Sequence, residues 1–104
     1  MTPGELSERL AGPNPPHLLD VRQAEEHAWA ALPGSTLMPL DELQDRFEEL
    51  AGWRDEEVVV YCHHGIRSTQ AVGFLRNLGF RRLHNLAGGL DRWSLDVDKS
   101  VPRY

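Results

Sequence analysis

Several features that mark disulfide-bonded, metal-binding or membrane-spanning proteins are scarce or missing in this chain. Its 104 residues include a single cysteine, Cys62, which excludes an intramolecular disulfide, a cysteine-rich zinc site and a dithiol redox motif. No apolar run approaches the roughly 20 residues that span a bilayer. The first residues have neither the basic stretch nor the apolar core of a secretory signal. We therefore expect one cytoplasmic domain over residues 1–104, without membrane contact.

Positive charge is also scarce. The 11 basic residues, all arginine except Lys99, stand against 16 acidic residues, and the formal net charge is −5. Because binding to nucleic acid relies on clustered Lys and Arg, this balance argues against a nucleic-acid partner. A site for an anionic substrate would have to create its own local positive field.

The chain alternates strand and helix patterns, which predicts an α/β domain around a mostly parallel sheet. An unbroken run of three β-branched valines and a tyrosine over 58–61 is typical of a strand covered on both faces. Two further strands are expected over 17–21 and 82–86. Helices are expected from a capping box at Thr2 and Glu5, over 23–30, over 40–50 with Gly52 as its end, over 71–78 with Gly79 as its end, and around 91–93.

Cys62 is placed at the carboxyl end of the expected central strand, directly before a helix, where open α/β sheets bind ligands. Backbone N–H groups of the loop and of the first helical turn remain unpaired there, and the helix dipole adds its positive end. Both favour the thiolate, which is the nucleophilic form. Gly65 permits a tight turn, and Arg67 brings a fixed charge suited to an oxyanion or to holding the loop. An isolated cysteine is more often a small buried apolar residue, so this setting decides the interpretation.

Residues 62–68 resemble the Cys-x-x-Gly-x-Arg-Ser active-site loop of small rhodaneses; they are Cys62, His63, His64, Gly65, Ile66, Arg67 and Ser68. Three further segments are similar to motifs of that family, in the same order. They are Asp-Val-Arg at 20–22, Leu-Pro-Gly-Ser at 32–35 and Gly-Gly…Trp at 88–93. One segment alone would be a weak match, but four in order extend over most of the chain.

The resemblance implies a single rhodanese domain with three α/β/α layers and a sulfurtransferase that needs no cofactor. Cys62 would take the outer sulfur of thiosulfate or of a protein persulfide, hold it as a persulfide, and pass it to cyanide or a thiol. Residues His63 to Ser68 would form the anion-binding part of the loop. The protein is expected as a monomer or weak dimer.

Two alternatives remain open. A persulfide carrier or regulatory binding module in a sulfur-relay pathway needs the same loop, so the sequence does not separate it from an enzyme with free turnover. A cysteine phosphatase of related fold would use a Cys-x5-Arg loop. Here only four residues separate Cys62 from Arg67, a tighter ring that suits a single sulfur atom.

Neighbouring side chains refine these expectations. Asp20 and Arg22 lie at the end of the strand expected over 17–21 and are interpreted as loop support, paired with each other or bracing the loop. His63 and His64 stand where thiosulfate-preferring members of the family often carry a fixed cation, and neutral imidazole attracts thiosulfate less strongly. Adjacent histidines point different ways and lack a third ligand nearby in the sequence, so we expect no metal.

Overall fold

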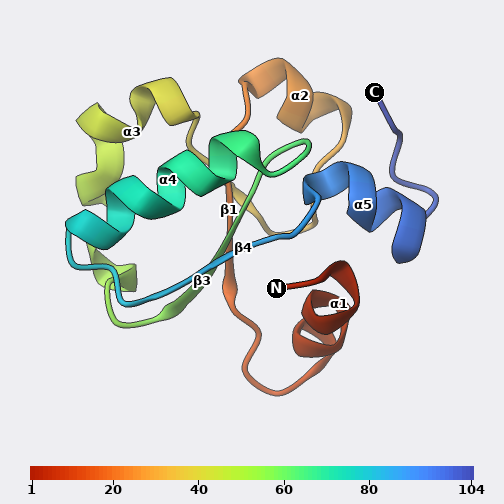
Figure 1. Cartoon of the computed structure of the whole chain (residues 1–104), viewed down its shortest axis with the longest axis horizontal. Helices are drawn as coiled ribbons and strands as arrows, with labels where there is room; N and C mark the ends of the chain where they lie inside the picture. The colour runs from red at the N-terminus through yellow and green to blue at the C-terminus, as the bar shows by residue number, and fades with distance from the viewer.

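The computed structural model describes residues 1–104 and contains a sheet of four parallel strands in the order β2-β1-β3-β4. Helices cover both faces of this sheet (Figure 1), which confirms the three-layer α/β prediction. None of the helices has the length and apolar character needed to cross a membrane. In chain order the elements are α1 (Pro3–Ala11), β1 (His17–Asp20), α2 (Ala24–Trp29), β2 (Thr36–Leu37), α3 (Leu40–Arg46), the 3-10 helix η1 (Phe47–Trp53), β3 (Glu57–Tyr61), α4 (Ile66–Asn77), β4 (Arg82–Asn85) and α5 (Gly89–Asp96).

The first helix begins as its sequence predicts. The hydroxyl of Thr2 accepts a hydrogen bond from the backbone N–H of Glu5, and the Glu5 carboxylate accepts one from the N–H of Thr2. Pro3 occupies the first helical position, where its missing N–H costs nothing. The helix can then bury Leu6 completely against the sheet.

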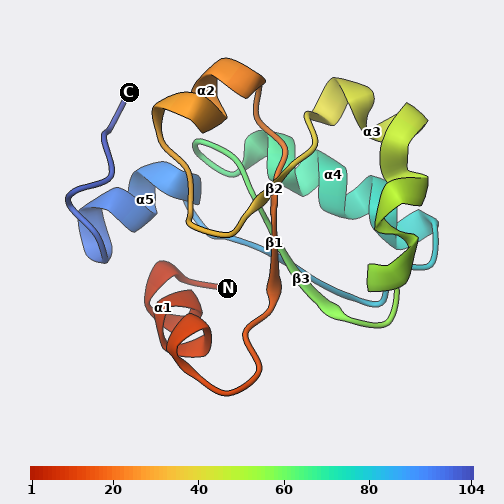
Figure 2. The same ribbon diagram turned by 180° about the vertical axis from the view of Figure 1, so that it is seen from behind.

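Strand β3 divides the core into two apolar clusters. Val58 and Val60 point into the cluster under α3 and α4, whereas Val59 and Tyr61 point into the cluster under α1 and α5. The same grouping of helices is visible from behind in Figure 2. Because alternate residues of a strand face opposite sides, an unbroken apolar run is what a strand buried on both faces requires. The strand prediction for this segment is confirmed.

The continuous helix expected over 40–50 is wrong. Helix α3 ends at Arg46, whose backbone turns to φ −121° and ψ −1°, and the 3-10 helix η1 follows. A 3-10 helix has three residues per turn, so side chains three apart share one face. Phe47, Leu50 and Trp53 have this spacing and all pack on the core cluster below α3 and α4. The 3-10 geometry brings all three apolar side chains to the core.

The remaining elements differ from expectation mainly at their ends. Strands β1 and β4 each stop one residue earlier than predicted, and α2 is one residue shorter at both ends. The two-residue strand β2 was not predicted; it pairs with the end of β1, Leu19 with Thr36 and Asp20 with Leu37. Such a short segment carries no recognisable period in the sequence.

Candidate active site

Cys62 is the first residue after β3, and the loop that follows folds around its sulfur. The backbone N–H of Gly65 donates to Sγ at 3.0 Å and that of Ser68 donates at 3.4 Å. The Ser68 hydroxyl oxygen also lies 3.4 Å from Sγ. Only 1% of Cys62 is exposed. The loop is therefore a cradle of donors closed around one sulfur atom, with the geometry that stabilises negative charge on sulfur.

The cradle depends on the backbone conformation of Gly65. This residue has φ +108°, in the left-handed region that disfavours residues with a β-carbon, and it immediately precedes the first residue of α4. The turn directs the free amide of Ser68, in the first turn of α4, toward Sγ. The hydroxyl of Thr69 donates to the Gly65 carbonyl at 2.7 Å and holds the turn from the helix side. Ile66 is 73% exposed, so its side chain points away from this arrangement.

Asn85, the last residue of β4, supports the loop from the neighbouring strand. Its side-chain oxygen accepts a hydrogen bond from the hydroxyl of Ser68, and its amide donates to the Thr69 hydroxyl at 2.8 Å. Asn85 was not predicted as a site residue from the sequence. Its position at the carboxyl end of a strand, the same edge of the sheet that carries Cys62, was the signal that could have identified it.

The start of α5 secures the other side of the loop. The backbone N–H of Leu90 donates to the carbonyl of Cys62 at 2.8 Å, and that of Asp91 donates to the carbonyl of His63 at 3.0 Å. Gly89 has φ +64°, and a β-carbon there would lie 2.4 to 2.5 Å from these two carbonyl oxygens. The Gly88-Gly89 pair thus borders the site and lets α5 approach the backbone of the Cys62 loop closely.

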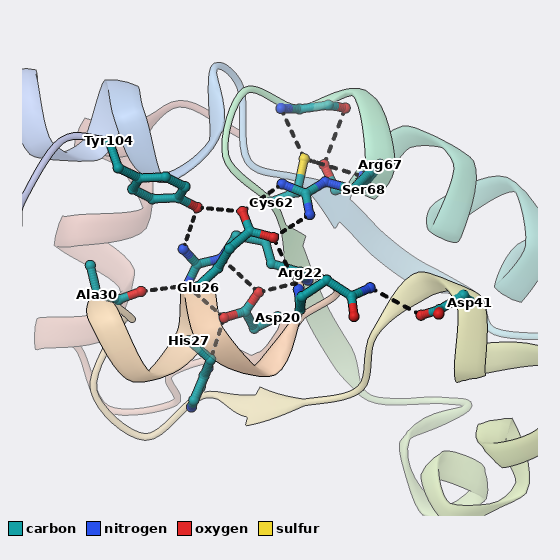
Figure 3. A network of polar contacts seen from close by, with 12 residues as sticks. Asp20, Arg22, Glu26, His27, Ala30, Asp41, Cys62, Arg67, Ser68 and Tyr104 are labelled. Carbon is teal, nitrogen blue, oxygen red and sulfur yellow. Dashed lines mark hydrogen bonds and ion pairs between the residues drawn. The ribbon is translucent and has the colours of Figure 1, made fainter.

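Arg67 projects from the first turn of α4 toward α2. Its guanidinium donates two hydrogen bonds to the carboxylate of Glu26, at 2.5 and 2.8 Å (Figure 3). These bonds hold the pKa of Glu26 well below its usual range, at about 2, with smaller contributions from the Gln23 amide and the Tyr104 hydroxyl. Of the two roles expected for Arg67, anion binding and holding the loop, the observed contact corresponds to the second.

Asp20 and Arg22 pair with each other, and both side chains are fully buried. Arg22 donates to both carboxylate oxygens, at 2.9 and 2.7 Å, and also to the carbonyl of Ala30. Burial opposes the charge of Arg22, but hydrogen bonds and attraction to Asp20 outweigh it and raise the pKa of Arg22. His27 adds a further contact to Asp20 at 2.7 Å. The pair therefore braces α2, which in turn carries Glu26 toward the loop.

The two loop histidines lie against each other, and His63 also lies against Tyr104. The ring of His63 is 4.0 Å from that of His64 and 4.0 Å from that of Tyr104, centroid to centroid. Burial, followed by the proximity of His64, lowers the pKa of His63. The Tyr104 hydroxyl accepts from Arg22 at 2.6 Å and donates to Glu26 at 2.8 Å. These contacts of Tyr104 were not predicted, because nothing near Tyr104 in the sequence indicates them.

The described residues contain no group of three or more His, Cys, Asp or Glu side chains placed to hold a metal ion. His63 and His64 accordingly belong to no cluster of this kind. Every residue predicted for the loop, from Cys62 to Ser68, is brought to the same edge of the sheet as the Asp20–Arg22 pair.

Comparison with known proteins gives relatives over almost the whole chain. Residues 2–96 match the family described as the Rhodanese-like domain. A sulfurtransferase of Allochromatium vinosum is 36% identical over 89 residues, which cover 86% of this chain and 81% of that protein. A putative sulfur carrier protein of Bacillus subtilis, YrkF, is 35% identical over 78 residues, 75% of this chain and 41% of that protein. Other curated relatives are longer, and the chain spans between 21% and 30% of their length.

Solved structures of similar fold also include sulfurtransferases and rhodanese-like proteins. The human single-domain sulfurtransferase TSTD1 superposes with a TM-score of 0.80 at 30% sequence identity, covering 92% of this chain and 95% of that one. A rhodanese-like domain protein from Staphylococcus aureus gives a TM-score of 0.82 at 28% identity, over 100% of this chain and 96% of the other.

Proposed function

We propose, from the premise that this chain belongs to the rhodanese-like family of sulfurtransferases and sulfur carriers, that Cys62 carries a transferred sulfur as a persulfide. The protein would accept a sulfane sulfur from thiosulfate or from a protein persulfide and deliver it to cyanide or a thiol. The observation that carries the proposal is the convergence of the Gly65 and Ser68 amides on Sγ. Two fixed donors at one sulfur support an anionic intermediate without any reorganisation of the loop.

The reaction divides into two nucleophilic displacements. In the first, the Cys62 thiolate attacks the outer sulfur of thiosulfate, and the bond between the two sulfur atoms of the donor breaks. Sulfite leaves with the electron pair of that bond. In the second, an acceptor such as cyanide attacks the terminal sulfur of the persulfide, forms thiocyanate and restores the thiolate. The charge is the same on both sides of each step.

The acceptor must come from outside the chain, because Cys62 is its only cysteine. No second thiol is present to resolve the persulfide as an internal disulfide. The persulfide therefore persists until an external acceptor arrives, and the burial of Cys62 restricts which molecules reach it. This behaviour is common to an enzyme with free turnover and to a carrier that serves one partner.

A persulfide carrier is the second candidate, and the similarity to a putative sulfur carrier protein favours it. The two candidates differ in the source of the sulfur. A carrier accepts sulfur much faster from a protein persulfide than from thiosulfate, whereas an enzyme with free turnover cycles with thiosulfate and cyanide. Pre-steady-state measurement of sulfur uptake from both donors separates them.

Intact-protein mass spectrometry tests the proposal. The protein is measured after thiosulfate, then after cyanide, and separately after a protein persulfide donor. We expect a gain of one sulfur that cyanide removes and that a Cys62→Ser variant does not show. Since there is one cysteine, the added sulfur has a single location. If the unaltered protein gains no sulfur from either donor, Cys62 is not a sulfur carrier and the proposal fails.

A further inference from the structure

The positive charges around the Cys62 loop are neutralised by carboxylates of the chain itself. Three arginines each form an ion pair: Arg67 with Glu26, Arg22 with Asp20, and Arg103 with Asp91. Of these three, Arg67 is the one on the loop itself. Its charge therefore decides how strongly the site attracts an anionic donor.

Glu26 is held in place by three groups. Both guanidinium nitrogens of Arg67 donate to it, the Tyr104 hydroxyl donates to Oε2 at 2.8 Å, and the backbone N–H of Gln23 donates to Oε1 at 3.1 Å. The Asp20–Arg22 pair anchors the start of α2 and hence the backbone from which Glu26 projects. These bonds keep the pKa of Glu26 at about 2, so its full negative charge faces Arg67 at neutral pH.

Arg67 directly precedes Ser68, whose backbone N–H and hydroxyl oxygen both lie 3.4 Å from the Cys62 sulfur. The hydrogen bonds from Arg67 to Glu26 raise its pKa most, and attraction to Glu26 and then to Cys62 adds to this rise. In Figure 3 the guanidinium lies in view between the Cys62 sulfur and the Glu26 carboxylate. A change in the charge of Glu26 therefore changes the electrostatic potential at the point where the donor reacts.

We propose that Glu26 determines donor specificity by neutralising Arg67, so that the site selects monoanionic sulfane-sulfur donors over dianionic thiosulfate. An organic persulfide, including one carried on a protein, belongs to the favoured class. The inference rests on the proposed function and names its donor class. Glu26 acts through Arg67 and does not touch the reacting atoms.

The physical reason lies in the charge that meets at the reacting sulfur. A thiolate that attacks thiosulfate brings one negative charge to a donor that already holds two. A free guanidinium beside the sulfur would offset this repulsion, but a guanidinium paired with a carboxylate presents no net charge. A monoanionic donor meets weaker repulsion and loses less when Arg67 is neutralised.

Thiosulfate and methanethiosulfonate form a suitable pair of probes. They have the same shape around the transferred sulfur, but a methyl group replaces one oxygen and the second charge is removed. Attack by Cys62 on the outer sulfur releases sulfite from the first and methanesulfinate from the second, each with the electron pair of the broken bond. The kcat/KM for each donor is measured with cyanide as the acceptor.

Glu26→Gln is the decisive variant. It keeps the size of the side chain and removes the charge that opposes Arg67. We expect the thiosulfate kcat/KM to rise about tenfold relative to that for methanethiosulfonate, and the gain to shrink as ionic strength increases. A double variant with Arg67→Gln should lose the gain, because the freed charge belongs to Arg67.

Glu25→Gln is the matched control. Glu25 lies next to Glu26 in α2, is exposed, and forms no side-chain hydrogen bond or ion pair, so its removal changes the net charge of the protein equally. We expect it to leave the ratio of the two donors unchanged. A ratio that rises equally in both variants would show an effect of net charge alone and would overturn the inference.

Two further results would also overturn it. If Glu26→Gln leaves the donor ratio unchanged while the protein still transfers sulfur, Arg67 does not influence donor choice. If both kcat/KM values fall by the same factor, Glu26 serves only to hold the loop. Either result leaves the proposed function intact. By contrast, if the unaltered protein takes sulfur neither from the two probes nor from a protein persulfide donor, the proposed function itself is contradicted.

Discussion

Two neighbouring turns of this protein, one after β1 and one after β3, connect a strand to a helix but are held together by different groups. Each follows a buried parallel strand, ends at the same edge of the sheet and leads into a helix. The turn after β1 (residues 21–23) is organised by the charged side chains of Asp20 and Arg22, which pair with each other and find their remaining hydrogen-bond partners within the protein. The turn after β3 (residues 62–65) is organised by backbone amides that converge on one sulfur.

The difference separates a structural turn from a chemical one. A buried ion pair with all its hydrogen bonds filled has no capacity for another ligand, and losing either partner leaves an unpaired buried charge. Backbone amides that point at a sulfur can still donate hydrogen bonds when the sulfur gains another atom. The backbone fixes these donors, and they do not depend on the oxidation state or the charge of the sulfur. Only the turn after β3 is therefore suited to a reaction that adds and removes an atom.

The largest effect is expected for Asp20→Asn, which tests whether the buried ion pair organises the turn after β1. The substitution leaves Arg22 fully buried without its counter-charge, so we expect it to destabilise the folded state by about 3–5 kcal/mol. Urea unfolding followed by circular dichroism measures the loss. Asp45→Asn is the control, since Asp45 is exposed on α3, and it should change stability by less than about 0.5 kcal/mol. Equal effects of the two substitutions would show that the buried pair is not the anchor described.

A second test concerns the contact between α5 and the turn after β3. Gly89→Ala forces a β-carbon toward the carbonyl oxygens of Cys62 and His63 and places alanine at φ +64°. We expect a loss of about 2–3 kcal/mol and slower sulfur uptake by Cys62, because the loop must shift. Thermal unfolding and mass spectrometry after thiosulfate measure the two effects.

Gly73→Ala is the matched control for this glycine. Gly73 lies within α4, and a β-carbon there would meet nothing within 4 Å. Alanine is the better helix former by about 0.5–1 kcal/mol, so this variant should melt at a higher temperature with unchanged sulfur uptake. A loss of stability in both variants would contradict the steric explanation for Gly89.

The smallest expected effect comes from Ser68→Ala. The hydroxyl of Ser68 lies 3.4 Å from Sγ and donates to Asn85, but the backbone amides of Gly65 and Ser68 remain at the sulfur. We expect a stability loss of about 1 kcal/mol and sulfur uptake slowed by less than about tenfold. Rapid-mixing measurement of sulfur uptake tests the rate, with Ser100→Ala on the surface as the control. A complete loss of uptake would assign the main stabilising role to the hydroxyl and not to the amides.

Local patterns in the sequence were sufficient for much of the fold and for the centre of the site. The strand at 58–61, the capping box of α1 and the position of Cys62 before a helix depend on the period of side chains along the backbone and on single-residue conformations. These causes act within a few residues. The helix over 40–50 was predicted wrongly because apolar residues three apart fit both an α-helix and a 3-10 helix, and packing on the sheet decided between them.

The sequence by itself therefore determined which residue is the candidate nucleophile and which strand and helix hold it, since strand period, glycine conformation and free helical amides are properties of neighbouring residues. Only the tertiary structure decided the electrostatic environment of that residue. Arg67 had 16 acidic residues as candidate partners and pairs with Glu26, 41 positions away, while Tyr104 reaches the same carboxylate across 78 positions. Attraction between charges acts through space and not along the chain, so the partner is chosen by where folding places each carboxylate.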